Sequence, residues 1–249
     1  MVSAGVWACG WTPSDLFKGN IAHASLFYGA LTFPLRGAPP STRRSNLETQ
    51  TAPPMSLTES QMAHLGTDAP AFDLPAANPD ADARPGDTRS LSDFADANVL
   101  VVVFTCNHCP YAQHVEPALI ELAEEYQPHG VTFAAISAND PETHPEDSFS
   151  EMAARAEAKG YPFPYLYDET QEVARAYGAA CTPDFFVYGP GRTLAYRGRF
   201  DGTRPNKGTP TGEDLRAALD DLLEHGEVRT QQHPSIGCNI KWKPGMAPA

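Results

Sequence analysis

A Cys-x-x-Cys pair between a strand and a helix is the feature that most constrains this chain. Residues 98–104 are apolar and largely β-branched after Asn98, which is typical of a strand buried on both faces. The sequence then reads Cys106-Asn107-His108-Cys109, and from residue 106 to 127 the apolar residues follow helical spacing. This order predicts two thiols at the end of a central strand in an α/β fold.

The rest of the pattern alternates strands with helices. We expect strands over residues 131–137, 163–167, 184–188 and 194–200, and helices over residues 147–159, 170–177 and 211–225. Gly189-Pro190-Gly191 predicts a hairpin between the last two strands. The predicted fold class is therefore α/β, with a central mixed sheet flanked by helices.

The chain of 249 residues suits one domain with extensions. Residues 1–54 hold four basic and two acidic residues, whereas the whole chain carries a net charge of −13. We interpret residues 1–54 as an extension that is disordered or that precedes a natural start at Met55. Residues 55–230 are predicted to be the folded domain, and residues 231–249 a polar, irregular C-terminal tail.

Charge and hydropathy exclude several classes of partner. A net charge of −13 argues against nucleic acid, because phosphate binding needs clustered Lys and Arg. No stretch is long and apolar enough to span a membrane, and we find no secretory signal. We therefore expect an acidic cytoplasmic protein with neither a nucleic-acid nor a membrane partner, whose dithiol rests in the reduced state.

Three motifs in order resemble one family. They are Cys106-Asn107-His108-Cys109-Pro110-Tyr111, then Cys181-Thr182-Pro183-Asp184-Phe185-Phe186, and last Gly237-Cys238-Asn239-Ile240-Lys241-Trp242. The set resembles the redoxin branch of thioredoxin-like proteins, which is related to the AhpC/TSA peroxiredoxins. Over about residues 69–225, the resemblance implies a thioredoxin-like fold in which Pro183 is cis and faces the Cys-x-x-Cys.

Each motif residue has an expected role. Cys106 is the predicted nucleophile, because the N-terminus of a helix favours a thiolate. His108 would add positive charge, as the resemblance implies, and Cys109 would resolve a mixed disulfide. Thr182 and Pro183 would shape the substrate groove and offer backbone to an extended substrate.

Two further cysteines and a metal site remain as alternatives. Cys181 is either an accessory thiol or a small buried residue, and Cys238 is either a resolving thiol or a packing residue. Cysteines 106, 109, 181 and 238 with His108 include enough ligands for a metal. The chain lacks the second close pair typical of structural zinc, so we predict no metal and no cofactor.

The predicted function is a thiol–disulfide oxidoreductase that acts on protein or small-molecule thiols and disulfides. The alternatives are an antioxidant thiol peroxidase acting on peroxides, and a silent binding module. Peroxiredoxins carry Pro and Thr seven and three residues before the reactive cysteine. The corresponding residues are Val99 and Val103 when counted from Cys106, and Val102 and Cys106 when counted from Cys109. Peroxidase chemistry by that mechanism is therefore the second choice.

Overall fold

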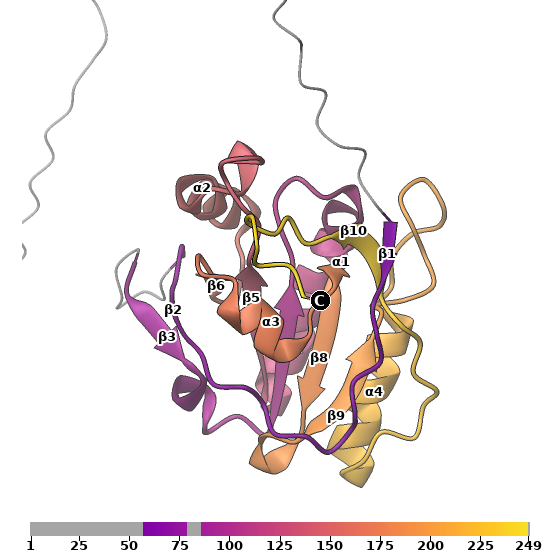
Figure 1. Cartoon of the computed structure of the whole chain (residues 1–249). Helices are drawn as coiled ribbons and strands as arrows, with labels where there is room; N and C mark the ends of the chain where they lie inside the picture. The colour runs from indigo at the N-terminus through magenta and orange to yellow at the C-terminus, as the bar shows by residue number, and fades with distance from the viewer. Residues whose placement is uncertain (1–56, 79–85, 249) are drawn as a thin grey trace, which may run out of the picture. The chain divides into compact units, whose positions relative to one another are not determined.

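The computed structural model describes residues 57–78 and 86–248 (Figure 1). The predicted extension over residues 1–54, with Cys9, lies outside the described residues. The domain is built on a five-stranded sheet of order β6-β5-β4-β8-β9. Its strands are β4 (Val99–Phe104), β5 (Val131–Ser137), β6 (Tyr165–Tyr167), β8 (Asp184–Tyr188) and β9 (Leu194–Gly198).

The strand before the Cys-x-x-Cys motif lies at the centre of this sheet. β4 pairs in parallel with β5 and antiparallel with β8, so that Phe104 lies opposite Ile136 on one side and Asp184 on the other. All six residues of β4 are buried, as the continuous apolar run predicted. The mixed sheet confirms the predicted α/β class.

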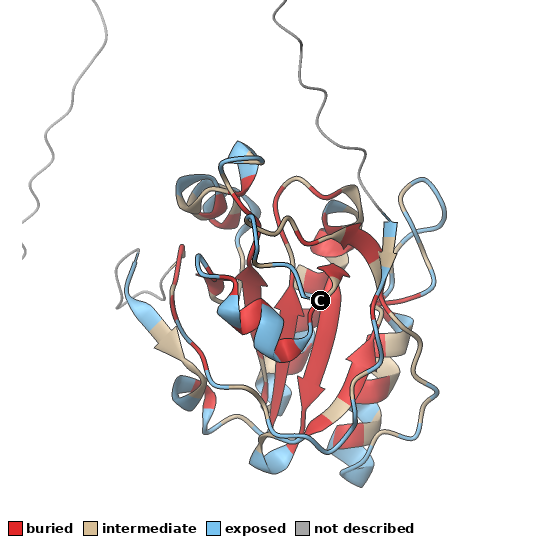
Figure 2. Cartoon of the chain, in the orientation of Figure 1, coloured by how far each residue is buried: buried red, intermediate tan, exposed pale blue. Residues whose placement is uncertain are grey.

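Both faces of the sheet are covered, and β4 contributes to both in alternation. Val99, Val101 and Val103 pack into a core shared with α1 (Pro110–Tyr126), α2 (Phe149–Lys159) and α4 (Glu213–His225). Leu100, Val102 and Phe104 pack on the other face, where α3 (Glu172–Tyr177) lies. Figure 2 accordingly shows the central strands as buried.

Two smaller sheets complete the domain. β2 (Asp73–Pro75) pairs with β3 (Thr88–Ser90). In the other sheet β10 (Ile236–Asn239) lies between β1 (Leu57–Glu59) and β7 (Cys181–Thr182), with both pairings antiparallel. The prediction of an irregular tail over residues 231–249 is therefore wrong at residues 236–239. Pairing with distant strands orders this segment, and a local pattern does not reveal such pairing.

The helices begin later than predicted. α1 starts at Pro110 instead of residue 106, and Cys109 is its N-cap in an extended conformation. Proline suits this first helical position because the N–H that it lacks would have no partner there. α2 starts at Phe149, because a 3-10 turn, η3 (Pro145–Asp147), precedes it.

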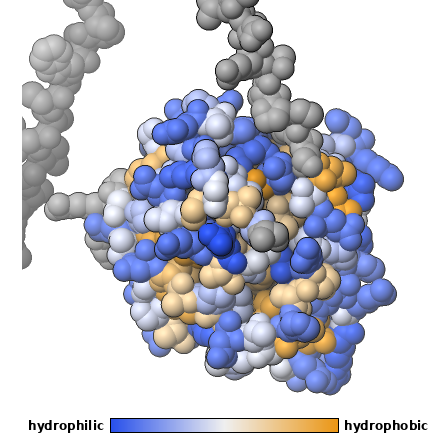
Figure 3. Space-filling view, viewed as in Figure 1, coloured by the Kyte–Doolittle hydropathy of each residue, from blue (hydrophilic) through white to orange (hydrophobic). Residues whose placement is uncertain are grey.

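The described surface is mostly polar. Figure 3 shows hydrophilic residues over much of the face seen in Figure 1, with apolar residues in separate patches. The exposed large apolar side chains are Leu57, Met62, Leu65 and Leu223. Within residues 57–78 and 86–248, no helix has the length and apolar character needed to cross a bilayer.

Candidate functional site

Cys106 and Cys109 lie in the turn between β4 and α1. Both thiols are buried: Cys106 is 4% exposed and Cys109 is fully enclosed. They pack in one cluster with Ala112 and Cys238, against the half-buried ring of Tyr111. The motif that the sequence identified is therefore a compact group of sulfur atoms beneath the surface.

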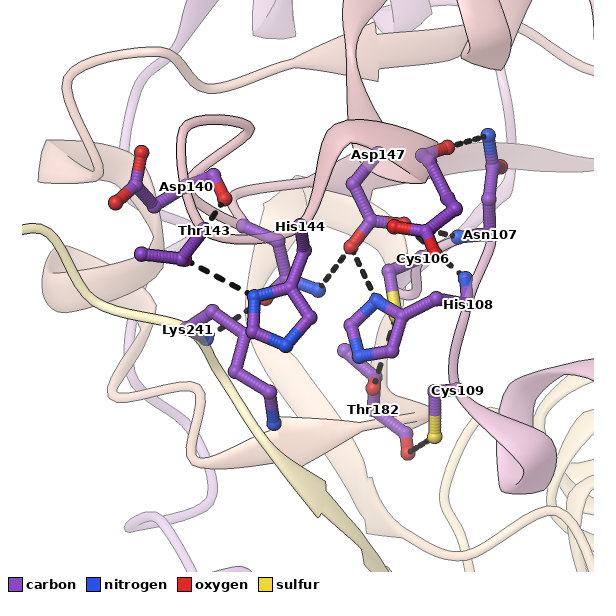
Figure 4. Close-up of polar contacts among 12 residues, drawn as sticks. Cys106, Asn107, His108, Cys109, Asp140, Thr143, His144, Asp147, Thr182 and Lys241 are labelled. Atoms are coloured by element: carbon purple, nitrogen blue, oxygen red, sulfur yellow. Dashed lines mark hydrogen bonds and ion pairs between the residues drawn. The ribbon is translucent and has the colours of Figure 1, made fainter. Parts of the chain in front are cut away.

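Thr182, in β7, contacts both thiols of the motif (Figure 4). Its hydroxyl lies 3.4 Å from the Cys106 sulfur, and its carbonyl oxygen lies 3.2 Å from the Cys109 sulfur. The Thr182-Pro183 peptide bond is cis, as the resemblance implied. The fold thus brings the second motif against the first.

The first half of the third motif lies in β10, the strand next to β7. In the register of β10 and β7, Cys238 lies opposite Thr182 and Asn239 lies opposite Cys181. The two strands approach so closely at Gly237 that a Cβ atom there would overlap the Thr182 carbonyl group. The edge that we expected to be open to an extended substrate is therefore covered by the chain itself.

His108 forms a short hydrogen bond with Asp147, a residue that the sequence analysis did not identify. The His108 Nδ1 atom lies 2.5 Å from Asp147 Oδ2 and 3.8 Å from the Cys106 sulfur. Because the Asp147 carboxylate can only accept, His108 Nδ1 is the donor in this bond and is not free to act as a base toward Cys106. The ring of His144 packs against that of His108, with centroids 4.4 Å apart.

Asp147 organises the whole turn. Its Oδ1 accepts the backbone N–H groups of Asn107 at 2.8 Å and His108 at 3.1 Å, and its Oδ2 also accepts the Asn139 amide at 2.8 Å. Burial favours a raised pKa for Asp147, but hydrogen bonds and charge from His108, with the Asn139 bond, outweigh it and lower the pKa. No local pattern marks Asp147, because it lies in η3, far along the chain from the cysteines.

The two motif thiols differ in acidity, and the order is the reverse of our expectation. Burial, the hydrogen bond with Cys109 and the charge of Asp147 raise the pKa of Cys106 well above its usual value. Hydrogen bonds from Cys106 and Cys238, with the Ala112 N–H, lower the pKa of Cys109. The physical reason is that the Cys109 sulfur receives hydrogen bonds from the two thiols on either side of it, whereas Cys106 is dominated by burial.

The other two cysteines differ in position. Cys238 is 3% exposed and belongs to the thiol cluster. Cys181 is fully buried, and its thiol contacts the Pro183 carbonyl at 3.8 Å. Because side chains alternate along a strand, Thr182 faces the motif whereas Cys181 does not. This placement favours the packing alternative for Cys181.

Cys106, His108 and Asp147 also offer three potential metal ligands, with donor atoms within 4.8 Å of one another. Both oxygens of Asp147 already accept two hydrogen bonds each. An ion bound by His108 Nδ1 and Asp147 would have to replace the bond between them. The donor set therefore fits a hydrogen-bonded turn better than a metal centre.

Comparisons with known proteins add to this geometry. The chain is similar over 77% of its length, at 52% identity and a TM-score of 0.71, to an uncharacterized conserved protein from Geobacillus kaustophilus, of which it covers 98%. It is similar over 76%, at 46% identity and a TM-score of 0.71, to a hypothetical protein from Sinorhizobium meliloti, of which it covers 100%. A comparison with curated proteins found no match.

A family model also matches residues 65–197, which is more than half of the chain and includes the first two motifs. The match agrees with the mixed sheet, the Cys-x-x-Cys turn and the cis proline, and the predicted resemblance and fold are confirmed. The chain is a redoxin with a thioredoxin-like fold, and it belongs to the AhpC/TSA family.

Proposed function

We propose that this protein is a thiol–disulfide oxidoreductase whose working pair is Cys106 and Cys109. The observation that carries the proposal is the placement of both sulfur atoms against Thr182, next to a cis proline, at the N-terminus of a helix. Cys106 is the more exposed of the two thiols, so it is the one that a substrate reaches. Cys109 lies beneath it and resolves the mixed disulfide that forms on Cys106.

The reduced pair holds one proton, carried by Cys106 and shared with the Cys109 thiolate. As the Cys106 sulfur attacks a substrate disulfide, its proton passes to Cys109 and the first substrate sulfur leaves as a thiolate. Cys109 then attacks Cys106, and its proton goes to the second substrate sulfur, which leaves as a thiol. The pair is oxidised to a disulfide, and the substrate is reduced by two electrons.

His108 and Asp147 act as positioning residues in this scheme. Asp147 accepts the backbone N–H groups of Asn107 and His108, so it fixes the turn that separates the two thiols. It also holds the His108 ring beside Cys106. The Asp147 charge disfavours a thiolate at Cys106, so the thiolate forms at Cys109 instead.

The surroundings of the pair favour small disulfides over extended peptides. A peptide could pair with the Thr182 backbone only by displacing β10. Two hollows border the site instead, one lined by Asn107, His108 and Arg155 and the other by Tyr111, Pro183 and Ile236. The first hollow is large enough for a compact ligand, so we propose low-molecular-weight disulfides as the substrate class.

Turnover of a small disulfide by the full chain tests the proposal. With oxidised glutathione as substrate and dithiothreitol as reductant, we expect Cys106→Ser to lose turnover completely and Cys109→Ser to stop at a mixed disulfide on Cys106. Cys181→Ser is the matched control, because Cys181 is buried close by but outside the thiol cluster. Full activity in Cys106→Ser would refute the proposal.

The same variants separate the alternatives. A thiol peroxidase would turn over hydrogen peroxide faster than oxidised glutathione and would depend on Cys106 alone in its first step. Family membership favours keeping this candidate, although buried strand residues Val99, Val102 and Val103 stand where peroxiredoxins carry their Pro and Thr. A silent binding module would show neither activity.

A further inference from the structure

We propose that Cys238 is a third redox thiol, which exchanges with the Cys106–Cys109 disulfide to form an intramolecular Cys109–Cys238 disulfide. The inference rests on the proposed function, which supplies the first disulfide. It adds a step that the family match, which ends at residue 197, does not include. It assigns a chemical role to the strand that covers the site.

The first observation is packing. Cys238 is in the same buried cluster as Cys106 and Cys109, which come from a distant part of the chain. Ala112, in the first turn of α1, completes the cluster. Cys238 is only 3% exposed, so the partners available to its sulfur are those of the cluster, and external thiols reach it poorly.

The second observation is the way in which the fold positions the Cys238 backbone. β10 is held on both edges, by Leu57 of β1 and by Thr182 of β7, each opposite Cys238 in the register. The Thr182 carbonyl oxygen in turn lies 3.2 Å from the Cys109 sulfur. Thr182 therefore joins the strand of Cys238 to the sulfur of Cys109.

The third observation concerns the state of the sulfur atoms. The hydrogen bond with Cys109, more than burial, raises the pKa of Cys238. The same bond lowers the pKa of Cys109. The Cys238 thiol thus carries a proton that points to Cys109. When Cys106 and Cys109 are bridged, the Cys109 sulfur is the electrophile adjacent to Cys238.

The step balances without an added oxidant. The Cys238 sulfur attacks the Cys109 sulfur, the Cys106–Cys109 bond breaks, and the Cys109–Cys238 bond forms. Cys106 leaves as a thiolate and takes up the proton that Cys238 releases. The chain remains oxidised by two electrons, but the thiol that meets substrate is restored and the disulfide lies in the interior.

Disulfide mapping on the full chain tests this exchange. Reduced protein is treated with oxidised glutathione, quenched with acid, labelled with N-ethylmaleimide, digested without reductant and sequenced by mass spectrometry. In the wild type we expect a Cys109–Cys238 linkage together with label on Cys106. In Cys238→Ser we expect only the Cys106–Cys109 linkage, and the label on Cys106 should fall severalfold.

Cys106→Ser tests the proximity of Cys109 and Cys238, because it retains only these two thiols in the cluster. A linked peptide containing both residues supports the inference, whereas a wild type that shows only the Cys106–Cys109 linkage overturns it. If Cys106→Ser does not unfold cooperatively, Cys106→Ala replaces it. Cys181→Ser is the control and should reproduce the wild-type linkages.

The two proposals fail in different ways. If the wild type and Cys238→Ser both form only the Cys106–Cys109 disulfide, only the third thiol is refuted. If no Cys106–Cys109 disulfide forms in either the wild type or Cys238→Ser, the proposed function itself is refuted.

Discussion

The Nδ1 atom of His108 lies 2.5 Å from Oδ2 of Asp147, although the two residues are 39 positions apart in the chain. This contact joins the Cys-x-x-Cys turn to η3. The carboxylate is fully buried and accepts four hydrogen bonds, three of which come from the turn itself. One carboxylate therefore holds the turn through hydrogen bonds and also acts on the acidity of Cys106 through its charge.

Asp147→Asn should destabilise the reduced protein by about 3 kcal/mol at pH 7, the scale expected when buried donors lose a charged acceptor. The pKa of Asp147 is lower in the folded than in the unfolded chain. Its ionised form therefore stabilises the fold above the unfolded value of about 3.9, and this contribution is lost as the pH falls through the folded value.

Urea unfolding at a series of pH values measures this difference. The difference in the free energy of unfolding between wild type and Asp147→Asn should be largest at pH 7 and should decrease below pH of about 4. The exposed carboxylate of Asp96 supplies the control, and Asp96→Asn should change stability by less than about 0.5 kcal/mol. A gap that stays constant down to pH of about 3 would contradict the assignment.

The reduced protein should carry one thiolate well below the pKa of a free cysteine, which is about 8.5. The pKa of Cys109 is lowered, so its thiolate is present across the neutral range, whereas burial raises the pKa of both Cys106 and Cys181. Thiolate absorbance at 240 nm, measured against the oxidised protein, should therefore persist at pH of about 6.

Two variants assign this signal. Cys109→Ser should remove the absorbance at pH of about 6, and Cys181→Ser should leave it unchanged. If the signal instead survives in Cys109→Ser and disappears in Cys106→Ser, the charge lies on Cys106, as the sequence suggested.

Glu116→Gln should weaken the packing of α1 on α2. Glu116 is 7% exposed, and it accepts two hydrogen bonds from Arg155, at 2.6 and 2.8 Å, and one from the Tyr161 hydroxyl at 2.5 Å. We expect a loss of about 2 kcal/mol, because the amide cannot accept all three bonds and leaves a guanidinium underpaired. Urea unfolding of Glu121→Gln, an exposed site on the same helix, is the comparison and should show almost no change.

Gly237→Ala should displace β10. The added methyl group would overlap the Thr182 carbonyl group, so β10 and β7 must separate, at a cost of about 1–3 kcal/mol. We expect lower thermal stability and a slower formation of any bond between Cys109 and Cys238.

Gly189→Ala tests whether the effect is specific. A Cβ atom at Gly189 would make only ordinary van der Waals contact with Leu222, at 3.6 Å. Equal destabilisation of the two variants would show that the close approach of β10 and β7 does not make Gly237 more sensitive to substitution than Gly189.

The central elements could be predicted because their signals are local. The buried run before Cys106 and residues 131–137 were predicted nearly to the residue, since strands covered on both faces need continuous apolar sequence. The cysteines, and Thr182 with Pro183, were found through motifs. Helix starts were less accurate, because the cap at Cys109 depends on backbone conformation and not on side-chain spacing.

Asp147 and β10 could not be predicted in the same way. Asp147 acts through contacts with the turn around His108, and an aspartate before a helix has many ordinary explanations. β10 has only four residues, and it is a strand because β1 and β7 are present on either side of it. Neither the contacts of Asp147 nor the pairing of β10 produces a periodic pattern in the sequence.

The position of β10 between two distant strands has a consequence for the order of folding. Its partners begin at Leu57 and Cys181, so the sheet closes only after nearly the whole domain has been synthesised and brought together. Until then Cys106 and Cys109 lack the cover that β10 provides. A nascent or partly folded chain, in which β10 is not yet paired, therefore exposes both thiols to oxidants, and the pairing of β10 with β1 and β7 covers them.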